Sequence, residues 1–431
     1  MNLTDNPRLR LLTLCALYVS QGMPFGFVTI TLAAYLSNRD MDEHVIGTVG
    51  LMVSLPWAMK WCWGPIIDRF GFLPMGRRRP WILLAQMLMA STIATMIAIP
   101  DLVLGLTTLC VMVYIHNIFG SLQDVSVDAL AVDLLEEEER GKANGLMYGS
   151  SYFGTFIGGA CMGKLLTVFN LRTAMVVQVA ILLVIMLFPL LLRERPGERL
   201  LPWTKGRSMA PQQGRSERSI DQVFGWLFKA FSLRSGLLAG VLALVVNIGT
   251  GVSVTVVVVL LIQRLGWTMG EFTDVNGGYV VWCGLAGSMA GGFLADRVGA
   301  RRLAAIATVL TGIAWIGFSL AEPYWADKSF VVAFLIVQEI LLAVLTVSLF
   351  ALFMGVSWPM VAATQFTAYM ALLNLSQGIG KALAGPLREL MSVGLVFFCI
   401  GVLQIAVVAI LPWIDPRQTR RVLGDAEPQE E

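Results

Sequence analysis

Charged residues are scarce in this chain, and long apolar runs are abundant. Lys, Arg, Asp and Glu make up only 14% of the 431 residues, whereas 56% are hydrophobic. An average soluble domain is about 25% charged, so this composition excludes a soluble globular protein. The strongly positive mean hydropathy therefore indicates a polytopic membrane protein.

The residues that build catalytic and metal sites are also few. Only two His are present, and the six Cys are scattered through apolar segments without ligand spacing. The sequence contains no Gly-Lys-Ser/Thr phosphate loop and no Gly-x-Ser-x-Gly nucleophile motif. We expect no enzyme, no cofactor and no metal. The net charge of +2 gives no reason to expect a nucleic-acid partner, and the oligomeric state is open.

Twelve segments are long and apolar enough to cross a bilayer, which requires about 20 residues. Most of the 31 Lys and Arg fall on one side of the membrane when the N-terminus is placed inside. Because positive loops stay in the cytoplasm, we expect both termini to be cytoplasmic. The spans are 9–36, 45–67, 80–99, 102–133, 143–169, 172–192, 234–264, 274–295, 302–321, 329–356, 362–390 and 394–413.

One polar, basic linker divides these spans into six and six. We predict an all-α membrane protein with an N-terminal six-helix bundle (1–192), a linker (193–233), a C-terminal bundle (234–413) and a cytoplasmic tail (414–431). The linker ends in "SIDQVFGWLFKAF", whose apolar residues recur at helical intervals. This pattern fits a helix on the cytoplasmic membrane face, or a partner-binding helix. The tail has no such periodicity, and we expect it to be disordered.

A short motif occurs in corresponding loops of the two halves. "GPIIDRFGFLPMGRRRP" follows the second span and "GGFLADRVGARR" the eighth, so that Asp68-Arg69 matches Asp296-Arg297. Its glycines permit close helix approach, and its charges can form a network at the helix ends. We predict a cytoplasmic latch, in which Asp133 pairs with the loop arginines. Its members are Asp68, Arg69, Arg77, Arg78, Asp133, Asp296 and Arg297.

Span count, linker and duplicated loop resemble the major facilitator superfamily. The resemblance implies two pseudo-symmetric six-helix bundles with a substrate cavity between them that opens alternately to either side. Within it, "LPWAMKWCWGPIIDRF", "GRRRPW" and "QDVSVDALAVDLL" look like the AmpG branch. That branch contains bacterial muropeptide permeases, acetyl-CoA transporters and siderophore permeases of the RhtX and FptX type. The resemblance to this branch implies that the protein lies in the bacterial inner membrane.

Several ionisable residues lie inside the predicted spans. With a rise of about 1.5 Å per residue, Asp124 lies roughly 13 Å from the cytoplasmic end of its helix, and Lys60 roughly 12 Å from the end of the second span. An isolated charge at such depth costs about 2.5 to 3.5 kcal/mol, so these side chains face a cavity or a partner. A buried ion pair that only fixes packing is the alternative reading.

Asp124 and Asp128 share one helical face, and Asp133 lies on another. We predict that one aspartate carries a proton while Lys60 meets either that carboxylate or an anionic substrate. The predicted proton-coupling and substrate-cavity residues are Lys60, Gln123, Asp124, Asp128, Glu339 and Lys381. The predicted function is a proton-coupled importer of a bulky anionic small molecule such as an anhydromuropeptide. A siderophore or other conjugate permease, an uncoupled facilitator and a membrane-embedded sensor remain alternatives.

Overall fold

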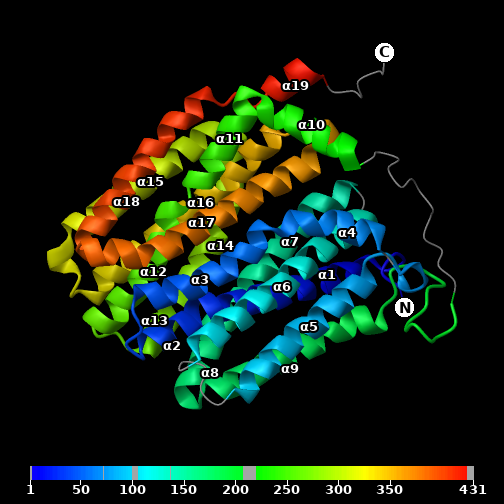
Figure 1. Cartoon of the computed structure of the whole chain (residues 1–431), viewed down its shortest axis with the longest axis horizontal. Helices are drawn as coiled ribbons and strands as arrows, with labels where there is room; N and C mark the ends of the chain where they lie inside the picture. Colours follow the sequence, from blue (N-terminus) through cyan, green and yellow to red (C-terminus); the bar gives the residue numbers. More distant parts are fainter. Residues whose placement is uncertain (1, 71, 100–104, 136, 207–219, 425–431) are drawn as a thin grey trace. The chain divides into compact units, whose positions relative to one another are not determined.

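The computed structural model describes residues 2–70, 72–99, 105–135, 137–206 and 220–424. Within these ranges the chain is helical throughout (Figure 1), and its one β-bridge joins Asn2 to Arg193. The prediction of an all-α protein is confirmed.

The predicted spans of the first half correspond to long helical segments. Several consist of an α-helix interrupted by one turn of π- or 3₁₀-helix. The elements are α1 (Pro7–Gly26), η1 (Phe27–Leu32), α2 (Ala33–Ser37), α3 (Glu43–Ala58), η2 (Lys60–Cys62), α4 (Trp63–Arg69), η3 (Leu73–Met75), α5 (Arg79–Ala98), α6 (Leu106–Leu134), α7 (Glu137–Phe156), η4 (Ile157–Cys161), α8 (Met162–Val168) and α9 (Leu171–Leu191).

The second half follows the same plan, preceded by the predicted linker helix. That helix, α10, extends from Ile220 to Ser232. The other elements are α11 (Arg234–Val245), α12 (Ile248–Val259), η5 (Leu260–Arg264), α13 (Met269–Asp274), η6 (Val275–Val280), α14 (Val281–Val298), α15 (Ala300–Leu320), η7 (Glu322–Tyr324), α16 (Lys328–Val356), η8 (Pro359–Val361), α17 (Ala362–Leu390), α18 (Val393–Val407), η9 (Val408–Trp413) and α19 (Gln418–Leu423).

Among the described residues, 10 helical segments are long and apolar enough to cross a membrane. Two more predicted spans are also continuous helices, Glu137–Val168 and Ala362–Leu390. Both contain more charged and polar residues than the other segments, because α7 begins with a run of charged residues and α17 contains Lys381 and Arg388. The structure is thus consistent with the twelve predicted helices.

The second span is not the uninterrupted helix that its hydropathy predicts. Pro56 lies in the last turn of α3, and the Met59 N–H bonds to the Pro56 carbonyl in place of a regular α-helical partner. Proline cannot donate a backbone hydrogen bond and disturbs the preceding turn. Helix α3 nevertheless continues to Ala58, and the 3₁₀ turn η2 then begins at Lys60.

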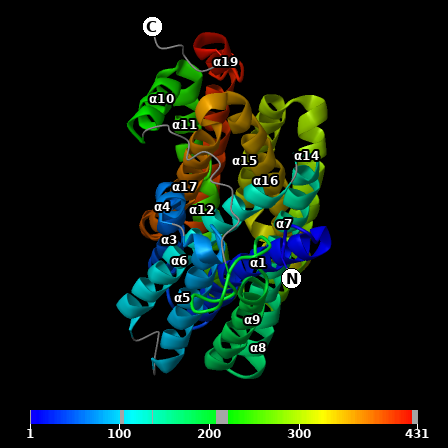
Figure 2. The same ribbon diagram turned by 90° about the vertical axis from the view of Figure 1, so that its right-hand side faces the viewer.

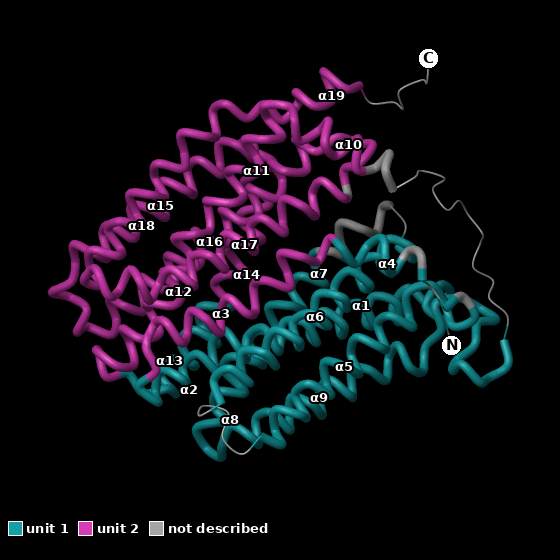
Figure 3. Tube along the Cα trace, in the orientation of Figure 1, with its two compact units in different colours: residues 1–40, 62–213, 267–281 teal, residues 41–61, 214–266, 282–431 magenta. Residues whose placement is uncertain are grey.

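Two compact units can be distinguished by their internal contacts (Figure 3). Unit 1 comprises residues 1–40, 62–213 and 267–281, and unit 2 comprises residues 41–61, 214–266 and 282–431. Each unit therefore contains segments from both sides of the linker, and the predicted bundle boundaries remain a prediction.

Glycines allow close backbone approach within each unit. In unit 1, a Cβ on Gly154 would lie 2.5 Å from the Val19 carbonyl oxygen, so α7 packs directly on the α1 backbone. In unit 2, a Cβ on Gly251 would lie 2.8 Å from the Lys381 backbone nitrogen, and α12 packs on α17 in the same way. Small residues at these positions suit helix packing in a membrane.

The expectation of a disordered tail is wrong for its first part. Residues 414–424 are folded: Ile414 is buried, and Thr419 in α19 donates to the Val356 carbonyl at 2.8 Å. The Trp358 indole also donates to the Gly424 carbonyl at 2.9 Å. A six-residue helix fixed by such distant contacts leaves no periodic signal in the sequence. Residues 425–431 lie outside the described residues.

Candidate functional site

In unit 1, the carboxylates of α6 lie beside tyrosines of two other helices. The Tyr18 hydroxyl of α1 donates to Asp128 at 2.5 Å. Tyr148 of α7 packs edge-to-face on the Tyr18 ring at a centroid distance of 6.1 Å. The charges of Asp124 and Asp128 act on both hydroxyls. Two carboxylates and two phenols from three helices thus form one cluster, which we call the carboxylate–tyrosine cluster.

Gln123 is next to Asp124 in the sequence, but its side chain lies between packed helices. Its amide donates to the Ser20 hydroxyl at 2.7 Å, and Gln86 of α5 donates to the same oxygen at 3.3 Å. Ser20 in turn donates to the Leu17 carbonyl. Gln123 is fully buried. Its amide therefore joins α1, α5 and α6, and the Gln123 and Gln86 side-chain carbonyl oxygens accept no hydrogen bond from the described part of the chain.

Lys60 and Lys381 are two buried cations of unit 2. The Lys60 ammonium lies 5.9 Å from the centre of the Trp57 ring, a distance at which the ring face attracts a cation. Lys381 of α17 donates to the Ser54 hydroxyl of α3 at 3.2 Å. Both side chains are at least 95% buried. Each ammonium thus lies beside an aromatic ring or a neutral hydroxyl, and each can attract an anion.

Glu339 lies on α16 of unit 2 and differs from the other carboxylates. It is half-buried, and it makes no hydrogen bond or ion pair within the described part of the chain. The neighbouring Gln338 accepts from Ser253 at 2.8 Å and from Trp315 at 2.6 Å, so it fixes helix packing. A carboxylate without a partner inside a membrane span is a functional candidate by default.

Some of the predicted latch residues of the first loop make polar contacts in the structure. The Arg78 guanidinium lies 2.9 Å from the Asp133 carboxylate, and the Arg78 side chain is only 6% exposed. Arg77 is half-buried, and its backbone N–H donates to Glu194 at 3.0 Å. The side chains of Asp68 and Arg69 lie outside the described residues. In this structure the start of α5 is therefore joined to the end of α6.

Glu194 was not predicted, yet it organises this loop. Its carboxylate accepts the N–H groups of Arg77, Arg78 and Arg79 at 3.0, 2.8 and 2.5 Å. Gly76 has a φ of +107°, and a Cβ there would lie 2.6 Å from the Glu194 carboxyl carbon. An anion at a helix N-terminus satisfies donors that the helix leaves open. Burial nevertheless raises the pKa of Glu194, and the three N–H groups oppose that rise.

Arg79 was also missed, and it closes the other side of the loop. It is 1% exposed. Its guanidinium donates to the carbonyls of Leu190 at 2.9 Å and Arg199 at 2.8 Å, and also to those of Pro189 and Leu200. The C-terminus of α9 is capped in this way. The sequence signal was the third arginine of the "GRRRPW" motif, directly before a proline at a helix start.

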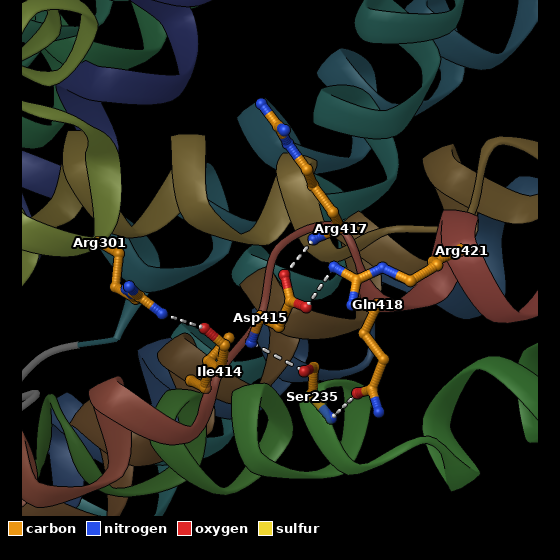
Figure 4. A network of polar contacts seen from close by, with 7 residues as sticks. All are labelled: Ser235, Arg301, Ile414, Asp415, Arg417, Gln418 and Arg421. Atoms are coloured by element: carbon orange, nitrogen blue, oxygen red, sulfur yellow. Dashed lines mark hydrogen bonds and ion pairs between the residues drawn. The ribbon is translucent and has the colours of Figure 1, made fainter.

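The second copy of the motif uses only part of this arrangement. Asp296 and Arg297 are exposed, and the Arg297 guanidinium lies over the Phe293 ring at 4.1 Å. Arg301, however, donates to the Ile414 carbonyl at 3.0 Å. Figure 4 shows this contact beside Asp415, whose N–H donates to Ser235. Arg301 thus holds the end of η9, much as Arg79 holds the end of α9.

The comparisons with known proteins agree with this architecture. The family described as the Major Facilitator Superfamily matches residues 12–270. This chain belongs to the Major Facilitator Superfamily. It is therefore a multi-pass membrane transporter of small molecules and not an enzyme, as the sequence predicted.

Among curated proteins, the chain is similar to AmpG-type transporters. It is 24% identical to the anhydromuropeptide permease of Escherichia coli K12 over 370 residues, which are 85% of this chain and 71% of the permease. It is 26% identical over 361 residues to the "putative transporter AmpG 4" of Rickettsia conorii, with 80% of each chain covered. The predicted resemblance to the AmpG branch is confirmed.

Two solved structures share the fold at low sequence identity. A mutant of the nucleoside transporter NupG has a TM-score of 0.70 at 13% identity, and the match covers 94% of this chain and 100% of that one. A D-xylose–proton symporter has a TM-score of 0.72 at 13% identity, with 95% of this chain and 98% of that one covered. The fold of a superfamily transporter thus extends over nearly the whole chain.

Proposed function

We propose that this protein is a proton-coupled importer that carries a bulky anionic solute, such as an anhydromuropeptide, across a bacterial inner membrane by alternating access. The curated relatives include an anhydromuropeptide permease, and one structural neighbour is a proton symporter. The observation that carries the proposal is the carboxylate–tyrosine cluster. It contains two carboxylates that lie one turn apart within a membrane-spanning helix.

Proton coupling requires a group that exchanges a proton inside the membrane. Asp128 has the Tyr18 hydroxyl as a close donor, and Asp124 lies one helical turn away on the same face. Carboxylates inside the membrane spans of transporters commonly serve as proton relays. We assign this pair the proton-carrying role, with Glu339 as the next candidate.

Recognition of an anionic solute requires positive charge in the membrane interior. Lys381 contacts the Ser54 hydroxyl, and Lys60 lies near the Trp57 ring. Both lysines are buried, so an anionic group that reaches either one meets a poorly solvated charge. We assign them to the carboxylate or phosphate groups of the substrate. A siderophore or another conjugate with anionic groups satisfies the same chemistry.

An uptake assay with purified protein in proteoliposomes separates these substrates. Radiolabelled anhydromuropeptide and a ferric siderophore are supplied separately, with and without an inward proton gradient. The proposal predicts accumulation of the anhydromuropeptide above its outside concentration only with the gradient. Accumulation of the siderophore alone would support the alternative permease. Flux of either ligand without accumulation would indicate a facilitator, and binding without flux a sensor.

A further inference from the structure

One end of unit 2 combines exposed aromatic rings with basic side chains. Helices α10, α11 and α19 meet there, as Figures 1 and 2 show from two directions. The exposed basic residues at this end are Lys229, Arg234, Arg417, Arg420 and Arg421. Among the side chains that the structure describes at this end, that of Asp415 is acidic, and it pairs with Arg421 at 2.9 Å. The described side chains at this end therefore carry a net positive charge.

Helix α10 is fixed to unit 2 by its inner face. Ala230 is fully buried, and Trp226 and Leu227 pack with it against Trp358. Phe231 lies edge-to-face on Tyr369 at a centroid distance of 5.2 Å. The apolar residues on the inner face of α10 are therefore covered by unit 2.

The outer face of α10 is also apolar, and nothing in the described part of unit 2 covers it. Phe224 is 51% exposed and Phe228 is 76% exposed. The two positions are four residues apart, so their rings project from the same side of the helix. Two phenylalanines exposed together on a short helix are unfavourable in water, which indicates that this face has an apolar partner.

The position of α10 along the chain favours the bilayer as that partner. The helix ends at Ser232, and the membrane span that begins with α11 starts at Arg234. A 13-residue helix is about 20 Å long, so Phe224 and Phe228 stay within that distance of the bilayer boundary. Interfacial helices bury aromatic and apolar side chains at the level of the lipid headgroups.

The basic side chains supply the complementary charge for anionic lipids. The Arg234 guanidinium lies over the Trp413 ring at 4.6 Å, and Trp413 is itself 59% exposed. Stacked Trp and Arg side chains suit the headgroup region. Figure 4 shows that Arg421 and the backbone N–H of Arg417 meet Asp415, which fixes this turn beside the start of α11.

We propose that this end of unit 2 docks on the bilayer surface and binds anionic phospholipid headgroups. Phe224 and Phe228 insert between the lipids, while Arg234, Arg417 and Arg420 contact the lipid phosphates. The inference does not depend on the transported substrate. It also gives the linker helix a role, because α10 then anchors the second half of the chain to one leaflet.

The aromatic face is tested by photo-crosslinking in nanodiscs. Benzoylphenylalanine replaces Phe228 in one full-length variant and Trp226 in another, and adducts are identified by mass spectrometry after irradiation. We expect lipid adducts at position 228 and crosslinks within the same chain at position 226. Crosslinks from position 228 to another part of the chain, or to a second copy, would overturn the proposal.

The headgroup preference is tested by native mass spectrometry with equal amounts of phosphatidylglycerol and phosphatidylcholine. The wild type is expected to retain more phosphatidylglycerol. R417Q/R420Q is expected to reduce that preference roughly fivefold for each arginine removed. These side chains are exposed, and the Arg421–Asp415 pair remains intact in the variant.

R264Q, at the opposite end of the same segment, serves as a matched control. No preference in the wild type, or an equal loss in R264Q, would overturn the proposal.

Discussion

Asp128 and Asp133 lie five positions apart on α6, yet they have different partners. Five residues rotate the side chain by about 140°, so the two carboxylates leave the helix on different sides. Asp128 meets Tyr18 of α1, and Asp133 meets Arg78 at the start of α5. At the scale of single residues, helical periodicity predicted this separation. It could not predict Tyr18, because nothing in the sequence relates positions 110 residues apart.

The contact between Tyr18 and Asp128 gives a first prediction. Tyr18→Phe removes a hydrogen bond to a carboxylate, a type of bond worth about 1.5 to 3 kcal/mol. We expect the initial rate of gradient-driven uptake to fall roughly tenfold while the protein still folds. Radiolabelled uptake in proteoliposomes measures the rate. Tyr35→Phe is the control, because Tyr35 uses its ring to contact Arg39. An unchanged rate in Tyr18→Phe would contradict the assigned role.

A second prediction concerns Glu198, which is buried in the segment after α9. Burial and the neighbouring Glu194 raise its pKa to about 7, although Arg79 and the Arg195 N–H oppose the rise. A raised pKa in the folded state means that the stabilisation is complete below about pH 4.5 and is lost as pH rises through about 7. Thermal stability in detergent should therefore fall between about pH 5 and about pH 8, by on the order of 1 kcal/mol or more.

Glu198→Gln should remove most of that pH dependence, because a neutral amide cannot ionise. Asp40→Asn is the matched control. Asp40 is exposed and has a positive φ of 59°, a conformation that Asn also adopts readily. Thermal shift measured across the pH range compares the three proteins. The same pH slope in wild type and Glu198→Gln would show that Glu198 is not the group responsible.

At the scale of helices, the sequence predicted where elements lie better than how they join. Each span was located from its apolar length, usually to within a few residues, because crossing a bilayer demands that length. The break at Lys60 was missed. The short helix α19 was also missed. Thr419 in that helix bonds to Val356 of α16, and the sequence around Thr419 does not indicate this distant contact. Hydropathy reports burial in lipid, and it does not report individual hydrogen bonds.

Helices α3 and α17 offer a third prediction, because the Arg388–Glu43 ion pair and the His44–Glu389 contact join them in unit 2. Arg388 lies 3.1 Å from Glu43, with side chains only 7% and 12% exposed, whereas His44 and Glu389 are 41% and 72% exposed. A double-mutant cycle with Arg388→Gln and Glu43→Gln should give a coupling of about 1 to 3 kcal/mol. The exposed His44–Glu389 pair should give less than about 1 kcal/mol. Equal couplings would contradict the burial argument.

At the scale of the whole molecule, the membrane orientation rests on the distribution of positive charge. The excess of Lys and Arg in the loops predicts cytoplasmic termini and a cytoplasmic linker. This leads to a fourth prediction, in which single cysteines are placed in a cysteine-free variant. A membrane-impermeant maleimide added to intact cells should label Asp327→Cys, but not Ser208→Cys or Gln429→Cys. Labelling of the last two without cell lysis would reverse the orientation.

The fold and the family could be predicted from features that span the whole chain. The contacts of the candidate site residues could not be predicted in this way. Repeated loops and a six-plus-six arrangement constrain the architecture strongly. Site residues depend on which face of each helix meets its neighbours, which sequence periodicity leaves open. Gln123 illustrates this: it is a predicted cavity residue, and the structure shows its amide bonded to Ser20 between helices.

The most direct test of the central claim is gradient-driven uptake by the aspartate variants. Proteoliposomes that contain wild type, Asp124→Asn or Asp128→Asn are loaded at equal protein content and given an inward proton gradient, and accumulation of labelled anhydromuropeptide is followed. Exchange of the substrate across the membrane without a gradient is measured in parallel. The account predicts that wild type accumulates substrate, whereas each variant loses accumulation and retains exchange. Undiminished accumulation in both variants would contradict it.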